Sequence, residues 1–315
     1  MKKLRILFMG TPEFSVPMLE AIHKSKYDLV GVVTAVDKPA GRGRKLKKSA
    51  VKIYAEKEHI PVLQPTNLKS DDFKKELQHL DPNLIVVVAF RMLPKQVWSY
   101  PKYGTFNLHA SLLPQYRGAA PINWAIINGE KETGLTTFFI DDKIDTGHII
   151  EKVSLPINAD DNVEDVYLKM LTKGKELVLS TLLQISKDSI QTKPQNEIGT
   201  LKPAPKLTKE NTRINWQVTG TNIYNHIRGL SPFPLAWTYL INGNDNILCK
   251  ISKVQFIEKK HNHEVGVVKA DDNMLYVAVK DGYIKILELK LAGKRLMKTT
   301  ELLNGYAIKS TAKMI

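Results

Sequence analysis

Two polar side chains occupy alternate positions of a short apolar run. The stretch FNLHASLLPQYRG, residues 106–118, places Asn107 and His109 two positions apart. Residues i and i+2 of a strand point to the same face of a sheet, so the amide and the imidazole are expected side by side. An amide can donate to a developing oxyanion, and an imidazole can carry a proton near neutral pH. The pair is therefore suited to direct transfer of an acyl group to an incoming amine.

Asp145, in DDKIDTGHI, is the third candidate, because a carboxylate can fix the tautomer of an imidazole and stabilise its charged form. The sequence has no G-x-S-x-G motif, so nothing indicates a covalent acyl-enzyme. The alternative interpretation stays open at this point. In it, Asn107 ends a strand, His109 is a core histidine with satisfied hydrogen bonds, and Asp145 belongs to a plain turn.

A strongly basic stretch, DKPAGRGRKLKK, is the second feature that could bind a ligand. Residues 38–48 contain no acid and six basic residues: Lys38, Arg42, Arg44, Lys45, Lys47 and Lys48. Two glycines and a proline predict a loop rather than a helix face, and such a loop can wrap phosphates. A solvated run of charges is the alternative. We favour a functional loop, since it follows a strand of the sheet expected below.

These candidates need elements that position them. Strands are expected at residues 5–10, 28–34, 84–90, 104–110 and 134–140, and helices at 16–23, 49–58, 119–127 and 163–185. This alternation predicts an α/β fold with a doubly wound, mostly parallel sheet, whose ligands bind at the carboxyl ends of the strands. Asn107 and His109 would lie at that edge. GTPEF, after the first strand, matches neither a dinucleotide-binding fingerprint nor a phosphate-binding P-loop.

The second half of the chain has a different composition. Proline and polar residues at 189–209 predict a linker, and the short alternating runs after it predict a small OB-like β-barrel. We therefore expect an N-terminal catalytic domain at 1–188 and a C-terminal domain at 210–315. From Lys206 onward the chain carries 17 Lys and Arg against 9 Asp and Glu.

Composition limits the class of protein. The 315 residues, 43% hydrophobic and 25% charged, indicate an ordinary globular protein of two domains. A net charge of +14 favours a polyanionic partner such as nucleic acid or an anionic membrane, or simply a basic surface. One cysteine, Cys249, excludes an intrachain disulfide, and we expect it to be a small buried hydrophobe. The N-terminal apolar run is too short for a signal peptide, so a soluble, cytoplasmic protein is expected.

Taken together, these motifs resemble those of the folate-dependent formyltransferases. The resemblance rests on GTPEF, on the basic loop, on NLHASLLPQYRGAAPINWAI and on IDTG, and it covers essentially the whole chain. The Asn-x-His, Ser-Leu-Leu-Pro and Asp pattern is shared throughout the family. The Arg-Gly-Ala-Ala-Pro continuation, the basic loop and the C-terminal domain narrow the resemblance to members that act on tRNA.

The resemblance implies transfer of a formyl group from 10-formyltetrahydrofolate to the α-amino group of methionine on initiator tRNA, in translation initiation, by a metal-free monomer. The implied catalytic residues are Asn107, His109 and Asp145. The implied folate-binding residues are Ser111, Leu112, Leu113 and Pro114. The implied tRNA-binding residues are Arg42, Arg44 and Lys45, with further tRNA contacts from the barrel. Arg91 and Lys143 depart from the family pattern, which more often has glycine at these positions beside the expected pterin pocket.

Three other functions remain open. The chain could formylate glycinamide ribonucleotide, although those enzymes usually carry a Gly-rich phosphate loop and lack a second domain. It could formylate an amino sugar, although those enzymes lack the basic loop. It could also be a non-catalytic tRNA-binding relative, against which the complete set of Asn107, His109 and Asp145 argues.

Overall fold

The structure is a computed structural model, and it describes residues 1–40, 45–197, 199–271 and 273–315, without the side chains of Ala40 and Lys45. Contacts divide the chain into two compact units. Unit 1 comprises Met1–Gly118, Thr133–Leu155 and Leu168–Pro203. Unit 2 comprises Ala119–Glu132, Pro156–Tyr167 and Ala204–Ile315.

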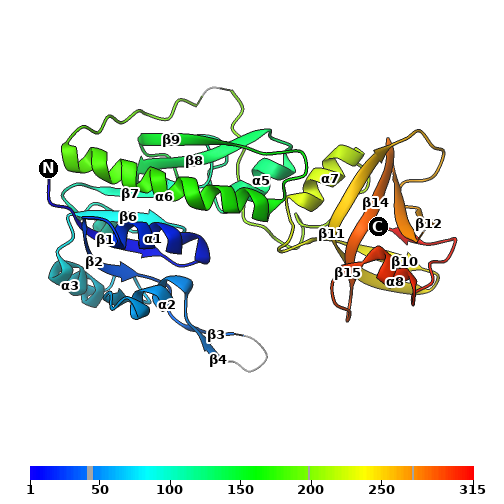
Figure 1. The fold of residues 1–315 in the computed structure, drawn as a ribbon, viewed down its shortest axis with the longest axis horizontal. Helices are drawn as coiled ribbons and strands as arrows, with labels where there is room; N and C mark the ends of the chain where they lie inside the picture. The colour runs from blue at the N-terminus through cyan, green and yellow to red at the C-terminus, as the bar shows by residue number, and fades with distance from the viewer. Residues whose placement is uncertain (41–44, 198, 272) are drawn as a thin grey trace. The chain divides into compact units, whose positions relative to one another are not determined.

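Unit 1 is built on a seven-stranded sheet, shown in Figure 1, with the strand order β5-β2-β1-β6-β7-β8-β9. Its strands are β1 (Arg5–Gly10), β2 (Asp28–Val33), β5 (Val62–Leu63), β6 (Leu84–Val88), β7 (Thr105–His109), β8 (Glu132–Phe139) and β9 (Ile149–Pro156). The strands from β5 to β7 pair in parallel, whereas β8 runs antiparallel to β7. The expected doubly wound, mostly parallel sheet is confirmed.

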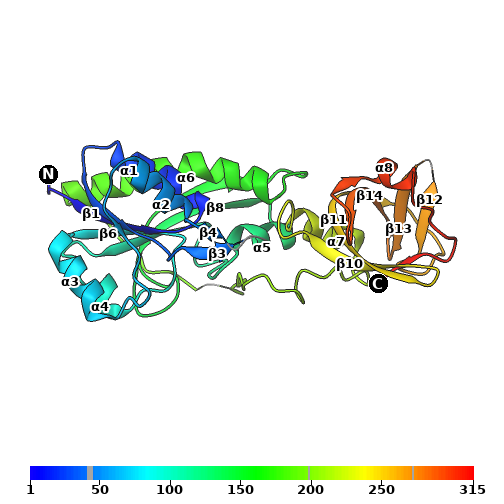
Figure 2. The same ribbon diagram turned by 90° about the horizontal axis from the view of Figure 1, so that it is seen from below.

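Helices cover both faces of this sheet. They are η1 (Glu13–Ser15), α1 (Val16–His23), α2 (Ala50–Lys57), α3 (Asp71–Leu80), α4 (Lys95–Trp98) and α6 (Val163–Lys187). Figure 2 shows α1 and α6 on one side of the sheet and α3 and α4 on the other. A Cβ added at Gly174 of α6 would touch Met18 of α1 and Leu108 of β7, so these elements pack closely.

The sequence explains both the buried strands and one helix that the prediction missed. All five residues of β6, LIVVV, are buried, as expected for a central strand covered on both faces. In α3, Ser70 accepts a hydrogen bond from the N–H of Phe73 as N-cap. Phe73 and Leu77, four residues apart, are fully buried, which stabilises the fold by about 1.5–3 kcal/mol for each side chain. No element was predicted at α3, α4, β5 or β9.

The basic stretch differs from the predicted loop at its ends. The strands β3 (Lys38–Ala40) and β4 (Lys45–Lys47) form an antiparallel pair. The loop prediction was therefore wrong for these flanks. Arg42 and Arg44 lie outside the described residues, and nothing is described of the Lys45 side chain.

Unit 2 contains an antiparallel barrel. Its strands are β10 (Ala236–Asn242), β11 (Asp245–Glu258), β12 (Val268–Asp271), β13 (Met274–Val279), β14 (Gly282–Leu291), β15 (Met297–Lys298) and β16 (Lys313–Met314), and its helices are α5 (Pro121–Ile127), α7 (Gly220–Arg228) and α8 (Thr299–Leu303). The sheet order is β12-β13-β14-β11-β10-β16. Val268 N donates to Ala312 O at 2.9 Å and Met314 N to Gly266 O at 2.8 Å, so the two edges meet. The predicted small barrel is confirmed.

Candidate active site

The strand β7 carries the first two candidate residues. Leu108 contacts the α6 side of the sheet, so Asn107 and His109 project from the opposite face. His109 is the last residue of the strand, at its carboxyl end. The predicted placement of the two side chains on one face of a strand end is therefore what the structure shows.

Each ring nitrogen of His109 faces a different polar group. Its Nε2 lies 2.8 Å from the backbone oxygen of Tyr116. A carbonyl oxygen only accepts hydrogen bonds, so Nε2 carries the proton and donates it to Tyr116. Its Nδ1 lies 3.7 Å from Oδ2 of Asp145, which is longer than a hydrogen bond. The side chains of His109 and Asp145 are only 7% and 13% exposed.

Asp145 lies in the loop between β8 and β9, far from β7 in sequence. The N–H of Gly118 donates to Oδ2 of Asp145 at 3.0 Å, which fixes the carboxylate. The loop must pass very close to the end of β8, because a Cβ at Gly147 would lie 1.7 Å from the backbone oxygen of Phe139. Only glycine fits there, so Gly147 is required for the loop to place Asp145 beside His109.

Asn107 has an unused acceptor. Its side-chain oxygen Oδ1 is buried and has no hydrogen-bond partner among the described residues. A buried amide oxygen without a partner costs free energy, typically about 1–3 kcal/mol. A ligand that donates an N–H to Asn107 would remove this cost.

The Ser-Leu-Leu-Pro stretch forms a tight turn directly after β7. Ser111 Oγ donates to Gln115 O at 2.6 Å, and Thr136 Oγ1 donates to Ser111 O at 2.7 Å. Ser111 and Leu113 are fully buried, whereas Leu112 and Pro114 are partly exposed. The side chains in this turn that can face a ligand are therefore those of Leu112 and Pro114.

Lys152, on β9, holds this turn and was not singled out by the sequence. Its Nζ donates to the backbone oxygen of Leu113. Burial lowers the pKa of Lys152, because the charged form loses hydration. A lysine in a strand carries no distinctive sequence signal, so only the structure shows this contact.

The two departures from the family pattern lie at the surface. Arg91 donates from its guanidinium to Thr66 O at 3.0 Å and to Pro65 O at 2.5 Å. Arg91 therefore ties the segment after β6 to the segment after β5. Lys143 is exposed, and its backbone N–H donates to Asp141 Oδ1 at 3.0 Å.

Cys249 has no place in this chemistry. It is fully buried in β11 of unit 2, and burial raises the pKa of its thiol to about 12. The thiolate is therefore scarce at neutral pH. The expectation of a small buried hydrophobe is confirmed.

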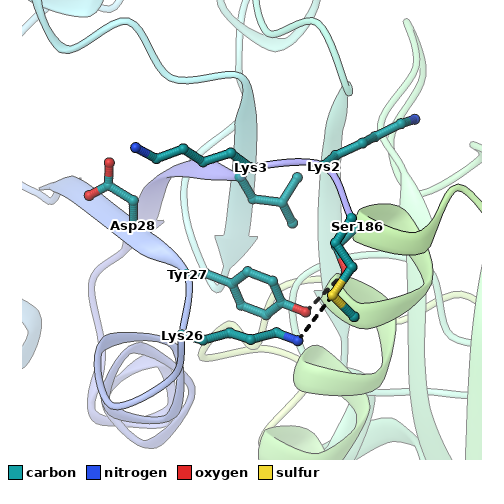
Figure 3. A pocket seen from close by; sticks show the side chains of 8 residues that line it. Lys2, Lys3, Lys26, Tyr27, Asp28 and Ser186 are labelled. Carbon is teal, nitrogen blue, oxygen red and sulfur yellow. Dashed lines mark hydrogen bonds between the residues drawn. The ribbon is translucent and has the colours of Figure 1, made fainter.

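A cavity in unit 1 lies away from these residues. It has a volume of about 150 Å³ and is drawn in Figure 3, where Tyr27 extends toward Ser186 and Lys26 toward the sulfur of Met1. Its lining includes Leu4 and Asp28, which lie where β1 and β2 begin. Ligands of such sheets bind at the carboxyl ends of the strands, so this cavity is at the wrong end for the site around His109.

In the described parts of the chain, no helix is both long and apolar enough to cross a membrane.

Both parts of the chain match models of known families. Residues 2–182 match the family model described as formyl transferase, and residues 206–307 match its C-terminal domain. The methionyl-tRNA formyltransferase of Flavobacterium johnsoniae is 51% identical over 314 residues, covering 100% of both chains. That of Bacteroides fragilis is 48% identical over 321 residues, covering 100% of this chain and 99% of the other.

A solved structure shares the fold at lower identity. The crystal structure of a sugar 3N-formyl transferase, in the presence of dTDP and 5-N-formyl-THF, is similar with a TM-score of 0.64 and 23% identity. It covers 94% of this chain and 100% of its own. Both formyl transferase models and the full-length relatives lead to one conclusion: the chain belongs to the family of methionyl-tRNA formyltransferases.

Proposed function

We propose that this protein transfers a formyl group from 10-formyltetrahydrofolate to the α-amino group of methionine on initiator tRNA. The observation that carries the proposal is sequence identity of 51% and 48% to two methionyl-tRNA formyltransferases, over the full length of this chain and therefore over both domains. The product, formylmethionyl-tRNA, serves translation initiation. Since one chain carries both units, we propose that it acts as a monomer in the cytoplasm, where charged tRNA is found.

The residues present fit such a donor and acceptor. Asn107 offers a buried acceptor that has no hydrogen-bond partner among the described residues, and His109 with Asp145 offers a proton carrier beside a carboxylate. We propose that Ser111, Leu112, Leu113 and Pro114 shape the folate site. Leu112 and Pro114 would contact the folate, and the buried pair Ser111 and Leu113 would hold the turn. When bound, the folate supplies the formyl group at the oxidation level of the product, so no redox partner is required.

Asn107 acts on the reacting atoms from both ends of its amide. Its NH2 group donates to the negative charge that develops on the formyl oxygen. Its Oδ1 accepts from the attacking amine, which orients the lone pair of that amine toward the formyl carbon. This use of Oδ1 accounts for its having no hydrogen-bond partner in the part of the chain that the structure describes.

His109 carries the proton of the transfer: the attacking amine loses a proton as its bond to the formyl carbon forms, and the folate nitrogen gains one as its own bond to that carbon breaks. The proton on its Nε2 is held by Tyr116 O, so its delivery requires this 2.8 Å bond to be exchanged for one to the leaving nitrogen. Protonation of Nδ1 turns the 3.7 Å approach of Asp145 into an attractive ion pair. Asp145 therefore stabilises the imidazolium form of His109 and orients its ring.

We propose that Arg42, Arg44 and Lys45 bind the acceptor end of the tRNA and that the barrel binds its outer part. The support is charge: residues 38–48 contain six basic residues and no acid. From Lys206 onward, basic residues outnumber acidic ones by 17 to 9. A polyanion gains affinity on such surfaces by releasing counterions.

One assay separates this function from its alternatives. The purified protein is incubated with 10-formyltetrahydrofolate and one of three acceptors: methionyl initiator tRNA, glycinamide ribonucleotide or a nucleotide-linked amino sugar. We expect formyl transfer to the charged tRNA at least ~10³-fold faster than to the small acceptors, as when binding energy from a large substrate is used at the reacting centre. Preference for a small acceptor would overturn the proposal. Tight tRNA binding without any transfer would indicate a non-catalytic relative.

A further inference from the structure

Gln195 differs from its neighbours in the segment predicted as a linker. Its side chain is partly buried, whereas the other residues at 191–197 are exposed. Its Nε2 donates to two backbone oxygens, those of Asp145 and Gly147, at 2.9 Å each. Its Oε1 accepts from Nε of Arg117 at 3.1 Å and from Nη2 at 2.7 Å. The amide of Gln195 thus makes four hydrogen bonds, all within unit 1.

The residues 116–118 connect these contacts to the active site. Tyr116 O accepts from His109, Arg117 donates to Gln195, and Gly118 N donates to the carboxylate of Asp145. Three consecutive residues therefore contact the imidazole, the linker glutamine and the carboxylate in turn. Gln195 and residues 116–118 hold Asp145 from two sides, one on its backbone and one on its side chain.

Backbone pairing brings Gln195 to this place. Lys193 exchanges two hydrogen bonds with Ile149 at the start of β9, of 2.8 and 2.9 Å. Further along, Tyr116 N donates to Lys202 O at 2.7 Å. These contacts fix the segment on both sides of Gln195, so its side chain has little freedom to lose when it binds the loop.

The loop needs external support at Asp145. This residue has a φ of +55°, in the left-handed region that non-glycine residues rarely adopt. Such a conformation persists only when surrounding contacts hold it. The two hydrogen bonds from Gln195 bracket Thr146 and supply that support directly.

We propose that Gln195 is a positioning residue for formyl transfer, which sets the carboxylate of Asp145 relative to His109 by holding the backbone at Asp145 and Gly147. Its catalytic consequence rests on the proposed function, whereas its effect on the loop does not. In this way a residue of the linker segment completes the transfer site.

The test uses two variants and a matched control in the full-length protein. Gln195→Glu keeps the shape but removes the NH2 donor, and Gln195→Met keeps the length without charge. Gln191→Glu makes the same chemical change at an exposed position four residues earlier. The first readout is amide hydrogen exchange of the free protein at Gly118 and over residues 139–149. We expect exchange to accelerate at least ~10-fold in both Gln195 variants and to be unchanged in the control, as local opening predicts.

The second readout is a double-mutant cycle in the formylation assay. We expect each Gln195 variant to lower kcat ~10–100-fold and to leave KM for tRNA within ~3-fold of the wild-type value. In a protein that already carries Asp145→Asn, we expect the same Gln195 change to lower kcat by less than a further ~2-fold. Unchanged exchange in both variants would overturn the inference, as would an equal loss of kcat in the Asp145→Asn background. If the wild-type protein transfers no formyl group, the proposed function fails, and hydrogen exchange alone decides the role of Gln195.

Discussion

Nδ1 of His109 lies 3.7 Å from Oδ2 of Asp145, while Nε2 of the same ring donates to Tyr116 O at 2.8 Å. The carboxylate is thus close enough to attract a charged imidazole but does not hydrogen bond to the ring in this state. The carboxylate of Asp145 instead accepts a hydrogen bond from the N–H of Gly118. The charge of Asp145 is therefore the property to test.

Asp145→Asn removes this charge and keeps the size of the side chain and an acceptor for Gly118. We expect kcat to fall about 10²-fold, because the imidazolium loses its counter-charge, with KM for tRNA little changed. Steady-state formylation kinetics measure both values. Asp142→Asn makes the same change at an exposed position of the same loop and is the control. A kcat for Asp145→Asn within 3-fold of the control would contradict the role of this charge.

Asn107→Leu removes both the proposed oxyanion donor and the side-chain oxygen Oδ1, which has no hydrogen-bond partner among the described residues. We expect kcat to fall about 10²–10³-fold, the usual cost of losing one such donor. Thermal stability should not fall, because the unpaired buried acceptor is lost as well. Kinetics and a melting curve check both expectations, with the exposed Asn244→Leu as control. A variant that keeps its kcat would exclude Asn107 from the reaction.

Lys152→Met tests the anchor of the turn at residues 111–114. The lost hydrogen bond to Leu113 O frees the backbone of the proposed folate site. We expect KM for 10-formyltetrahydrofolate to rise ~10-fold and kcat to change less than ~3-fold, since the reacting atoms are not touched. The control is Lys75→Met, which makes the same change at an exposed position of α3. An unchanged folate KM in Lys152→Met would show that the anchor is dispensable.

His226 in unit 2 gives a prediction for stability against pH. Burial lowers the pKa of this partly buried histidine, and contacts with the backbone of Thr212 and Arg213 oppose the shift. As the pH falls, His226 therefore binds a proton at a higher pH in the unfolded chain than in the folded protein. The stability contribution of His226 is therefore complete above about pH 6.5 and is lost as the pH falls through the lower folded-state pKa.

Melting curves at two pH values check this sign. We compare the fall in Tm between pH 8 and pH 5.5 in the two proteins. This fall should be about 2 °C smaller in His226→Gln than in the wild type, because the glutamine side chain does not titrate. The control is the exposed His59→Asn, which should lose as much Tm as the wild type. An equal loss in His226→Gln would show that this histidine is not the group responsible.

Arg42→Ala tests the tRNA contact expected of the basic loop. We expect KM for tRNA to rise, because one phosphate contact is lost. For the same reason, the magnitude of the slope of log affinity against log salt concentration should fall by about 1. Binding titrations at several salt concentrations measure the slope. Lys75→Ala removes one charge from the exposed side of α3 and should leave the slope unchanged. The same slope in Arg42→Ala and Lys75→Ala would remove Arg42 from the interface.

Features that depend on residues close together in the sequence could be predicted from it, whereas contacts between residues far apart in the sequence could not. Asn107 and His109 could be paired from their spacing, because the two-residue period of a strand fixes their common face. The approach of Asp145 depends on the path of the loop after β8. The chemistry of a carboxylate made Asp145 a candidate, but its position in the sequence did not place it beside His109. Phe73 and Leu77 of α3 carried a helical signal that the prediction did not use.

Gln195 shows what no local pattern contains. Its hydrogen bonds go to the backbone oxygens of Asp145 and Gly147, and every residue has such an oxygen. The composition of residues 189–209 indicates an extended linker but not where it docks. The pairing of Lys193 with Ile149, which determines this, is a tertiary contact between backbone groups.

The central claim is that Asn107 and His109 carry formyl transfer to methionyl initiator tRNA. A single-turnover experiment tests it most directly, with enzyme in excess over charged tRNA and saturating 10-formyltetrahydrofolate. The wild type should convert all the tRNA to the formylmethionyl form. The double variant Asn107→Ala, His109→Ala should react at least ~10⁴-fold more slowly and bind tRNA with an unchanged Kd. No formylmethionyl-tRNA from the wild type, or a wild-type rate in the double variant, would contradict the claim.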